Sequence, residues 1–299
     1  NSSNSSSSPT GLEISGNTFT NTYNGIFAQY YDGVTIRGNT IKGDGMYDTG
    51  IYLYYCDGAN VIEDNTIYGP DMSTGIYLYY CQATAGNEAT IANNLISVED
   101  NGIYLYRYNY YQNIYYNSVK VRDSYALHTY ASNNYNTLKN NILLTESVSL
   151  PAASFYNTTM FTSSDYNDFY SSFAYPIYVS GNKTLAQWQA TSDQDLNSVS
   201  INPYFDADSS LVPESYILDN KGTPIASILD DMYGTTRSET TPDMGATEFS
   251  VSGSPLSGSH TIGSGGDYDS ISTALNDLAI YGISGPVTFN ILPGIYTEQ

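Results

Sequence analysis

Two acidic residues recur at a fixed interval along the chain. Asp32 and Asp57 are 25 residues apart, and Gln82 follows after the same interval. If this interval is one turn of a repeating fold, the two carboxylates come from adjacent turns. A pair of carboxylates ~5–10 Å apart is what glycoside hydrolysis requires, so Asp32 and Asp57 are candidate catalytic residues. The alternative is that both are solvated corner residues, because few basic residues are nearby: Arg37, Lys42 and Arg107.

Carboxylate, amide and carbonyl oxygens are also the ligands that Ca²⁺ prefers. The acidic residues between the repeats match no known calcium loop in their spacing: Asp44, Asp48, Asp71, Glu99 and Asp100. Calcium therefore stays a possible ligand, and we expect no other cofactor. Cys56 and Cys81, with His128 and His260 as the two histidines of the chain, do not make a zinc site.

Tyrosine is the second chemically notable residue type, with 32 in 299 residues. Six tyrosines alternate with Ile and Leu, which places their rings opposite a buried apolar face. We expect two outward ladders, Tyr52, Tyr77 and Tyr104 in one and Tyr54, Tyr79 and Tyr106 in the other. Stacked rings stiffen a sheet. Alternatively, or in addition, such a strip is an amphipathic contact surface for sugar rings or for another filament.

The two cysteines stand at equivalent positions of neighbouring repeats. Their Cα atoms should be one strand spacing apart, ~4.8 Å, which lies within the range of disulfides. An intercoil disulfide would fit an oxidising compartment. An unbridged, stacked thiol pair is the alternative.

The elements that position these residues are short repeated strands. The phrase from Gly50 to Cys56 returns almost unchanged from Gly75 to Cys81, and weaker copies begin at Gly25 and Gly102. Each copy alternates apolar and aromatic residues, as strands do. Turn residues separate the strands, and no helix of crossover length lies between them. The sequence therefore predicts an all-β fold, a parallel β-helix solenoid.

A second phrase places an Asn at one corner of every repeat. Because a stacked amide can bond to the turns above and below it, the recurrence predicts an asparagine ladder. Asn also tolerates a left-handed corner, so a simple turn former is the alternative. The ladder residues are Asn17, Asn39, Asn65, Asn94, Asn117 and Asn141.

Composition excludes several partner classes. The 9 basic and 30 acidic residues give a formal charge of −21, which disfavours nucleic acid, because its binding depends on Lys and Arg. The same charge disfavours anionic membranes and suits an extracellular protein kept soluble by repulsion. No apolar run is long enough to span a membrane, so no membrane insertion is expected. Residues 1–8 are Asn and Ser only and do not resemble a signal peptide.

The chain divides by its patterns into five segments. Residues 1–11 are a linker or corner loop, 12–150 the regular coils, 151–249 irregular closing coils, and 250–264 a Ser/Gly-rich linker. Residues 265–299 contain a short amphipathic helix with an Asp as candidate N-cap, followed by strands. Such a helix can cover the apolar opening of a first coil.

The chain resembles the right-handed parallel β-helix, or pectate-lyase-like, superfamily. The residues that carry this are the Gly-Ile and Asn-Asn-x-Ile phrases and the closing Pro242-Asp243-Met244-Gly245-Ala246. They are similar to repeat domains of large bacterial secreted surface proteins, with Met where Ile is usual. The resemblance implies a right-handed helix, a cap at 265–299 that opens a following unit, and, for the enzymes of the superfamily, clustered Asp with Arg or Lys and often Ca²⁺.

From these observations we expect an extracellular, non-enzymatic rod at a bacterial surface or in a secreted filament. Its partners would be copies of itself, head to tail or in tandem in one chain, and polysaccharide bound through the tyrosines. A polysaccharide lyase or glycoside hydrolase using Asp32 and Asp57, and a carbohydrate-binding module, are the alternatives.

Overall fold

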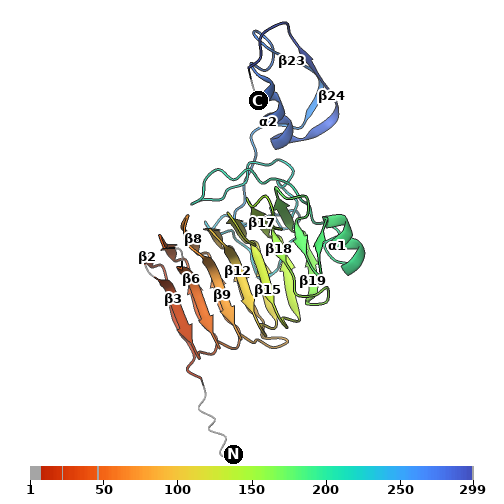
Figure 1. Cartoon of the computed structure of the whole chain (residues 1–299). Helices are drawn as coiled ribbons and strands as arrows, with labels where there is room; N and C mark the ends of the chain where they lie inside the picture. The colour runs from red at the N-terminus through yellow and green to blue at the C-terminus, as the bar shows by residue number, and fades with distance from the viewer. Residues whose placement is uncertain (1–7, 22, 46, 298–299) are drawn as a thin grey trace, which may run out of the picture.

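The protein is a three-sided parallel β-solenoid, described here from a computed structural model of residues 8–21, 23–45 and 47–297 (Figure 1). The solenoid and its small helical content confirm the predicted all-β fold class. Of the predicted N-terminal linker, residues 1–7 lie outside the described residues, as do residues 298 and 299 of the C-terminal segment.

Two seven-stranded parallel sheets form adjoining sides of the solenoid. The first sheet contains β1 (Glu13–Ser15), β4 (Thr35–Arg37), β7 (Val61–Glu63), β10 (Ala89–Ala92), β13 (Gln112–Tyr115), β16 (Asn136–Lys139) and β19 (Phe161–Asp165). The second contains β2 (Thr18–Thr20), β5 (Thr40–Lys42), β8 (Thr66–Tyr68), β11 (Leu95–Val98), β14 (Ser118–Val121), β17 (Ile142–Thr145) and β20 (Asp168–Ser171).

The third sheet carries the repeated tyrosine phrase. Its strands are β3 (Asn24–Gln29), β6 (Thr49–Tyr54), β9 (Thr74–Tyr79), β12 (Asn101–Tyr106), β15 (Leu127–Tyr130), β18 (Ala153–Ser154) and β21 (Ile177–Tyr178), with β22 (Asn182–Lys183) antiparallel at its edge. From β3 to β12 the pairing keeps each repeat phrase in register, so Ile26, Ile51, Ile76 and Ile103 stack as one buried column.

Glycine precedes the buried isoleucine in these strands for a steric reason. A Cβ at Gly50 would lie 2.5 Å from the carbonyl oxygen of Gly75, and one at Gly75 would lie 2.6 Å from that of Gly102. Real Cβ atoms do not approach this closely, so the Gly-Ile pair of the repeat follows from close packing between coils.

The asparagine ladder runs along the corner between the first and second sheets. Each predicted residue donates from Nδ2 to Oδ1 of the next, at 2.9–3.2 Å, from Asn17 to Asn141. Asn167 continues the series, and its Nδ2 donates to Asp195. The ladder prediction is confirmed. A second, unpredicted stack joins Asn109 to Asn133 at another corner.

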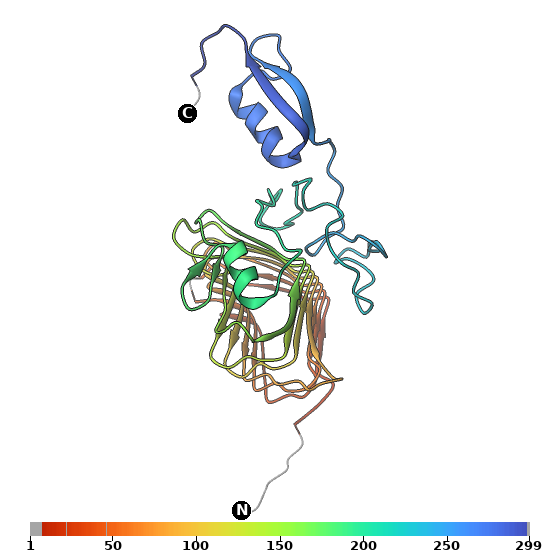
Figure 2. The ribbon, with the colours of Figure 1, turned by 90° about the vertical axis from the view of Figure 1, so that its right-hand side faces the viewer.

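The C-terminal end of the solenoid is closed by aromatic packing. Helix α1 (Leu185–Ser192) lies across it (Figure 2), and its buried Trp188 packs on Phe155 with ring centroids 5.1 Å apart. Thr184 and Gln187 form a capping box that starts this helix. The sequence analysis did not predict α1, because it has little amphipathic character.

Residues 200–249 contain neither helix nor strand and return along the corner of earlier coils. Arg237 donates to Asn93 at 2.9 Å, Thr223 accepts from the Tyr116 hydroxyl at 2.8 Å, and the Ala246 amide donates to Ser118. This segment therefore covers turns of the solenoid far from it in sequence.

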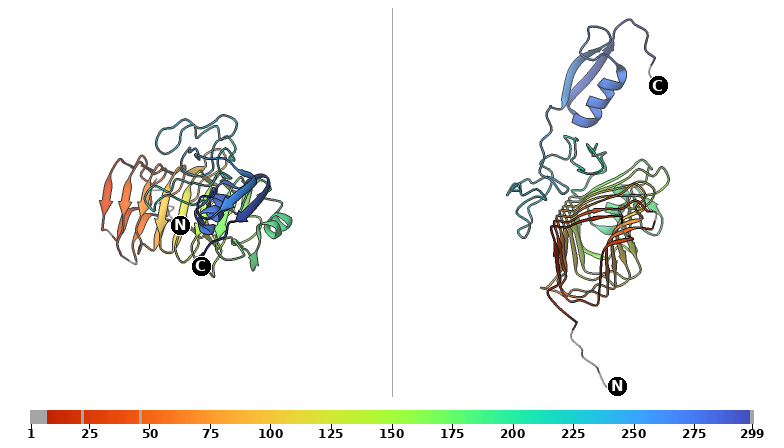
Figure 3. Two further views of the ribbon diagram at one scale, coloured as in Figure 1. Left: turned by 90° about the horizontal axis from the view of Figure 1, so that it is seen from above. Right: turned by 90° about the vertical axis from the view of Figure 1, so that its left-hand side faces the viewer.

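A separate small unit follows, in which β23 (Leu256–Ile262) pairs in parallel with β24 (Ile283–Ile291) beside α2 (Ile271–Tyr281). We call residues 256–296 the C-terminal block. It projects from the side of the solenoid (Figures 1 and 3). The predicted helix is present, but its N-cap is Ser270 rather than an Asp, because Asp267 accepts from the Thr261 amide and hydroxyl instead.

Candidate functional site

The outward rings of the third sheet form a continuous aromatic surface, which we call the tyrosine face. Its first column is Phe27, Tyr52, Tyr77, Tyr104 and His128, and its second is Tyr54, Tyr79, Tyr106 and Tyr130. A corner column follows the strands: Tyr30, Tyr55, Tyr80 and Tyr108. The six predicted ladder tyrosines thus lie together, within a surface larger than predicted.

Strand pairing sets the spacing of the rings. Centroids are 4.7 Å apart between Tyr52 and Tyr77, and 5.1 Å apart between Tyr77 and Tyr104, with interplanar angles of 25° and 22°. The second column is similar, at 4.9 Å between Tyr54 and Tyr79. The ring faces therefore point along the solenoid axis and cover one another, so that edges and hydroxyl groups face the solvent.

The corner column depends on an unusual backbone. Tyr30, Tyr55, Tyr80 and Tyr108 have φ between 51° and 59°, in the left-handed region that bulky residues rarely adopt. This conformation turns each ring back beside the second column: the rings of Tyr54 and Tyr55 lie 4.7 Å apart, edge to face. The repeated Tyr-Tyr pair indicates this corner, although the sequence analysis did not assign the second tyrosine to the surface.

The chemistry of the face is that of neutral hydroxyl groups. Burial, followed by neighbouring phenols, raises the pKa of Tyr52 and Tyr104 to about 12 and raises that of Tyr77 as well. These phenols stay protonated at physiological pH. In the described chain, the hydroxyls of these three residues donate to no protein group. The strands β3, β6, β9, β12 and β15 contain no Asp, Glu, Lys or Arg.

Two nitrogen-containing side chains lie at the end of the face nearest α1, one cationic and one neutral. The Arg107 guanidinium lies over the rings of Tyr106 and Tyr130, 5.1 and 5.8 Å from their centroids. His128 stacks on Tyr104 at 4.4 Å, and its Nδ1 is 3.0 Å from Asn101 Oδ1. Burial lowers the pKa of His128 to about 4, so this imidazole is neutral at pH 7.

Asp32 and Asp57 are brought into adjacent coils, where they pair in parallel. Both are exposed, and Asp57 Oδ1 accepts from the Gln82 amide at 2.8 Å. Partial burial, then the Asp32 carboxylate, raises the pKa of Asp57. Their catalytic role stays a prediction.

The cysteines are two free, buried thiols in neighbouring coils, which is the unbridged alternative. Cys56 Sγ lies 3.4 Å from the Ala28 carbonyl oxygen and Cys81 Sγ 3.5 Å from that of Leu53. Burial raises the pKa of both thiols. The pair is therefore held as neutral thiols within the core.

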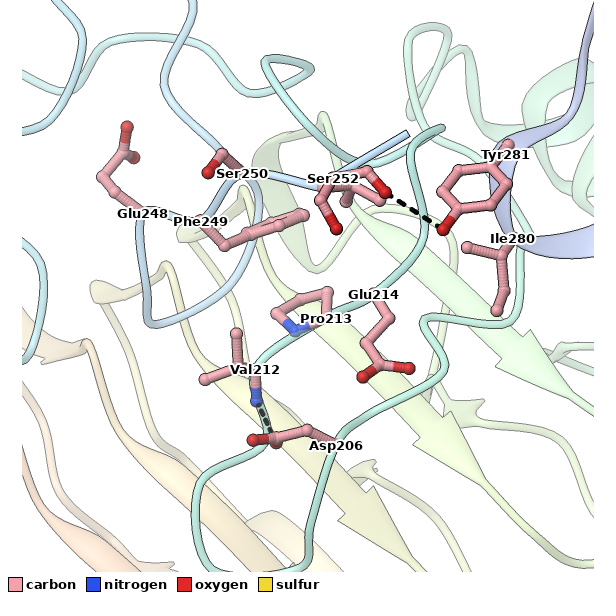
Figure 4. Close-up of a pocket in the computed structure, with 11 residues that line it drawn as sticks. Asp206, Val212, Pro213, Glu214, Glu248, Phe249, Ser250, Ser252, Ile280 and Tyr281 are labelled. Carbon is pink, nitrogen blue, oxygen red and sulfur yellow. Dashed lines mark hydrogen bonds between the residues drawn. The ribbon is translucent and has the colours of Figure 1, made fainter. Parts of the chain in front are cut away.

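A pocket of about 470 Å³ lies between the loops after α1 and the C-terminal block (Figure 4). Two of its three carboxylates hold loops in place. Asp206 accepts from the Val212 amide and the Ser210 hydroxyl, and Glu248 is paired with Arg237. This arrangement does not supply a free acid–base pair.

Residues 2–205 match the family model described as periplasmic copper-binding protein (NosD). No curated protein and no solved structure matches the chain. None of the helices in the described ranges is long and apolar enough to cross a membrane.

The copper in the family's description does not fit the residues of this chain. Among the residues that the structure describes, no three His, Cys, Asp or Glu side chains gather as a metal site. Copper(I) prefers thiolates and copper(II) prefers imidazoles, yet the two thiols are buried and neutral. The two histidines lie on separate units, His128 in β15 and His260 in β23.

Proposed function

Because the chain belongs to the NosD family of extracytoplasmic β-helix proteins, we propose that it is a structural rod module outside the cytoplasm. Copies of it join head to tail, either as separate chains or in tandem within one chain. The observation that carries this proposal is that the solenoid has one closed end and one open end, while the C-terminal block carries apolar surface without a cover.

The open end is the first coil. Among the described strands, β1, β2 and β3 are the last of their sheets on this side, so each presents a row of backbone groups that no described strand pairs. Leu12, Ile14 and Phe19 pack on the core from this coil but stay partly exposed. No described residue lies across it (Figure 3).

The asparagine ladder is also unfinished on this side. Each Asn donates toward the C-terminal neighbour, so Asn17 uses its amide nitrogens on Asn39 and Ser15. Its Oδ1 accepts from no group of the described chain. A coil arriving from another copy would supply the missing donor as well as strand partners.

The C-terminal block has the chemistry of such an arriving unit. Its buried apolar residues are Ile262 and Ala274, while Leu275, Ile283 and Ile291 are 52%, 63% and 57% exposed. Its two strands form a two-stranded parallel sheet, and among the described residues the other edge of β23 makes a single bridge, from Ile262 to Tyr268. A small sheet with so little core needs a larger apolar partner, and the first coil offers one of matching strand direction.

Electron microscopy and sedimentation of the purified chain test the proposal. We expect concentration-dependent filaments one solenoid wide. Leu275→Asp on the block and Phe19→Asp on the first coil should each reduce assembly, because each places a charge in the contact. The control is Val148→Asp, since Val148 is exposed on a loop of the solenoid. Monodisperse monomers at high concentration, or assembly unaffected by both variants, would contradict the proposal.

Polysaccharide contact through the tyrosine face is a second candidate, favoured by its uncharged, regular rows of hydroxyl groups. Because neighbouring rings cover the faces, sugars would be held by hydrogen bonds to ring edges rather than by stacking. Pull-down with insoluble glycans should detect binding that Tyr77→Ala with Tyr104→Ala removes. Retained glycan binding in that variant would exclude this role.

An enzymatic role for Asp32 and Asp57 is the remaining alternative. It predicts turnover of a glycan that Asp57→Asn abolishes while the fold is kept. If calcium assists, the turnover also requires added Ca²⁺ and fails in a chelator. No turnover on a panel of acidic and neutral glycans would leave the rod as the function.

A further inference from the structure

The rings of the tyrosine face make one uninterrupted path of aromatic contacts. In the second column the centroid separations are 4.9, 5.4 and 5.1 Å along the series Tyr54, Tyr79, Tyr106 and Tyr130. The first column joins this path sideways, since Tyr104 lies 5.6 Å from Tyr106. From Tyr54 in β6 to Tyr130 in β15 the path spans three strand spacings, about 14 Å.

The two columns differ in how they end. The first is bounded by Phe27, 5.1 Å from Tyr52, and by His128, 4.4 Å from Tyr104. Phenyl and neutral imidazole rings are both harder to oxidise than phenol. The second column ends in Tyr130, a phenol that is 45% exposed. An oxidised state formed within the tyrosine face therefore has an exposed phenol at each end of the path, Tyr130 at one and Tyr30, which is 51% exposed and 5.7 Å from Tyr54, at the other, and none along the first column.

We propose that the tyrosine face relays one-electron oxidation along the solenoid axis and delivers it to the exposed ring of Tyr130. A one-electron oxidant outside the protein, such as the ferryl haem of a peroxidase, removes an electron from Tyr54, and the phenolic proton passes to water. In each later transfer the neutral radical takes one electron from the next phenol and one proton from water, and that phenol gives its own proton to water, so the radical moves and the first phenol is restored.

The surroundings of the rings select this proton-coupled form of transfer. The Arg107 guanidinium, 5.1 Å from the centroid of Tyr106 and 5.8 Å from that of Tyr130, disfavours a positively charged ring. A neutral radical carries no such penalty. Of the two exposed phenols, Tyr30 lies beside the entry at Tyr54 and Tyr130 lies at the far end, where water accepts the proton more readily than it does from the half-buried rings between them.

At the surface, the chemistry ends in a covalent bond. Radicals on Tyr130 of two copies couple through a carbon of each ring, and as aromaticity returns that carbon loses its proton and the oxygen of the same ring takes one up. The sum is two tyrosines converted to one dityrosine, with two electrons passed to the oxidant and two protons to water. The relay would thus carry an oxidation that enters at Tyr54 to cross-links at Tyr130, at the far end of the face.

A tethered photo-oxidant tests the relay directly. Gln29 is exposed and pairs in register with Tyr54. A ruthenium tris-bipyridine maleimide attached to Gln29→Cys therefore sits at the start of the second column, while the native thiols are buried. After flash oxidation with a sacrificial electron acceptor and a nitroxide trap, peptide mass spectrometry should find adducts on Tyr130 as well as on Tyr54.

The decisive variant removes the phenols of one coil but keeps the stack. Tyr77→Phe, Tyr79→Phe and Tyr80→Phe together interrupt all three columns at β9 and the corner after it. We expect the Tyr130 adduct to disappear and the Tyr54 adduct to persist. The matched control changes Tyr68, Tyr115 and Tyr170 to Phe, since their rings make no ring-to-ring contact in the described ranges.

Each outcome decides the question. Loss of the Tyr130 adduct in the β9 variant alone supports the relay. Equal Tyr130 adducts in the parent and the β9 variant would show that the oxidant reached Tyr130 through solvent, and the relay would be wrong. Absence of any Tyr130 adduct in the parent protein would also overturn it. None of these results depends on whether the protein forms filaments.

Discussion

The two ends of the solenoid differ in how they cover the apolar core and in how they pair the last amides of the asparagine ladder. At the C-terminal end Trp188 is buried on Phe155, and Asp195 accepts the last ladder amide together with the Trp188 indole and the hydroxyls of Ser164 and Ser198. At the N-terminal end Phe19 is partly exposed, and Asn17 Oδ1 accepts from no group among the described residues. A carboxylate only accepts hydrogen bonds, so Asp195 stops the ladder in the one direction in which it donates. The ladder is therefore polar.

The largest test of this comparison removes the aromatic side chain at each end. Trp188→Ala should lower the free energy of unfolding by about 3–5 kcal/mol, because a buried indole leaves a cavity. It also removes a donor to Asp195. Phe19→Ala should lower the free energy of unfolding by clearly less, about 1 kcal/mol, because the Phe19 side chain is only partly buried. Urea denaturation of both variants measures the difference, and equal losses would show that the ends are equally packed.

A second test compares one ladder residue in the middle with one at the open end. Asn117 is buried and its side chain bonds to Asn94, Asn141 and the Ile91 carbonyl. Asn117→Ala should cost about 3 kcal/mol, since several buried groups lose their partners. Asn17→Ala, at an exposed position, should cost about 0.5 kcal/mol. The control for volume is Asn117→Leu; a ladder that tolerated it would owe its stability to packing rather than to hydrogen bonds.

The tyrosine face has two ends as well, and pH distinguishes them. His128 is held neutral with a pKa of about 4, below its unfolded value of 6.5. Below pH 6.5 the folded state then binds fewer protons than the unfolded one. The contribution of His128 to the free energy of unfolding is therefore fully present above pH 6.5 and is lost as pH falls toward 4. We expect a loss of about 2 kcal/mol over that range, read from urea unfolding. His128→Phe, which keeps a ring against Tyr104, should remove this part of the pH dependence; an unchanged profile would assign it to other groups.

The smallest expected effect is at the open end of the first column. The Phe27 ring lies tilted against that of Tyr52, with centroids 5.1 Å apart, and Phe27 is 49% exposed. Phe27→Tyr should therefore change the free energy of unfolding by no more than about 0.5 kcal/mol. A large loss would mean that this ring is less accessible than the structure has it, and that the open end is covered in solution.

The repeat could be predicted because it is a local pattern. Gly50, Ile51 and Tyr52 return in the next coil, and the strands, the buried isoleucines and the ladder asparagines all follow from that period. The second stack at Asn109 and Asn133 could not be predicted, because it occupies too few coils to establish a period. The helix α1 begins with the Thr184–Gln187 capping box, but its apolar residues do not follow a helical stripe.

Contacts between distant segments leave no such pattern. Arg237 donates to Asn93, 144 residues earlier, and nothing in either local sequence announces the other. The same limit applies to the tyrosine face. Alternation predicted that the rings point outward, but the mutual covering of their faces depends on χ angles and on the left-handed corner at Tyr55. That detail changes the chemistry of the surface from stacking platform to hydroxyl array.

The asparagine ladder sets the same rise for every coil of the solenoid. Successive ladder residues are separated by 22, 26, 29, 23, 24 and 26 residues, yet every step is closed by the same hydrogen bond. Insertions therefore enlarge the loops at the sides of the solenoid and leave its length along the axis unchanged. A gene encoding this protein can vary its loops, and with them whatever the sides present, while the reach of the rod changes only in whole strand spacings.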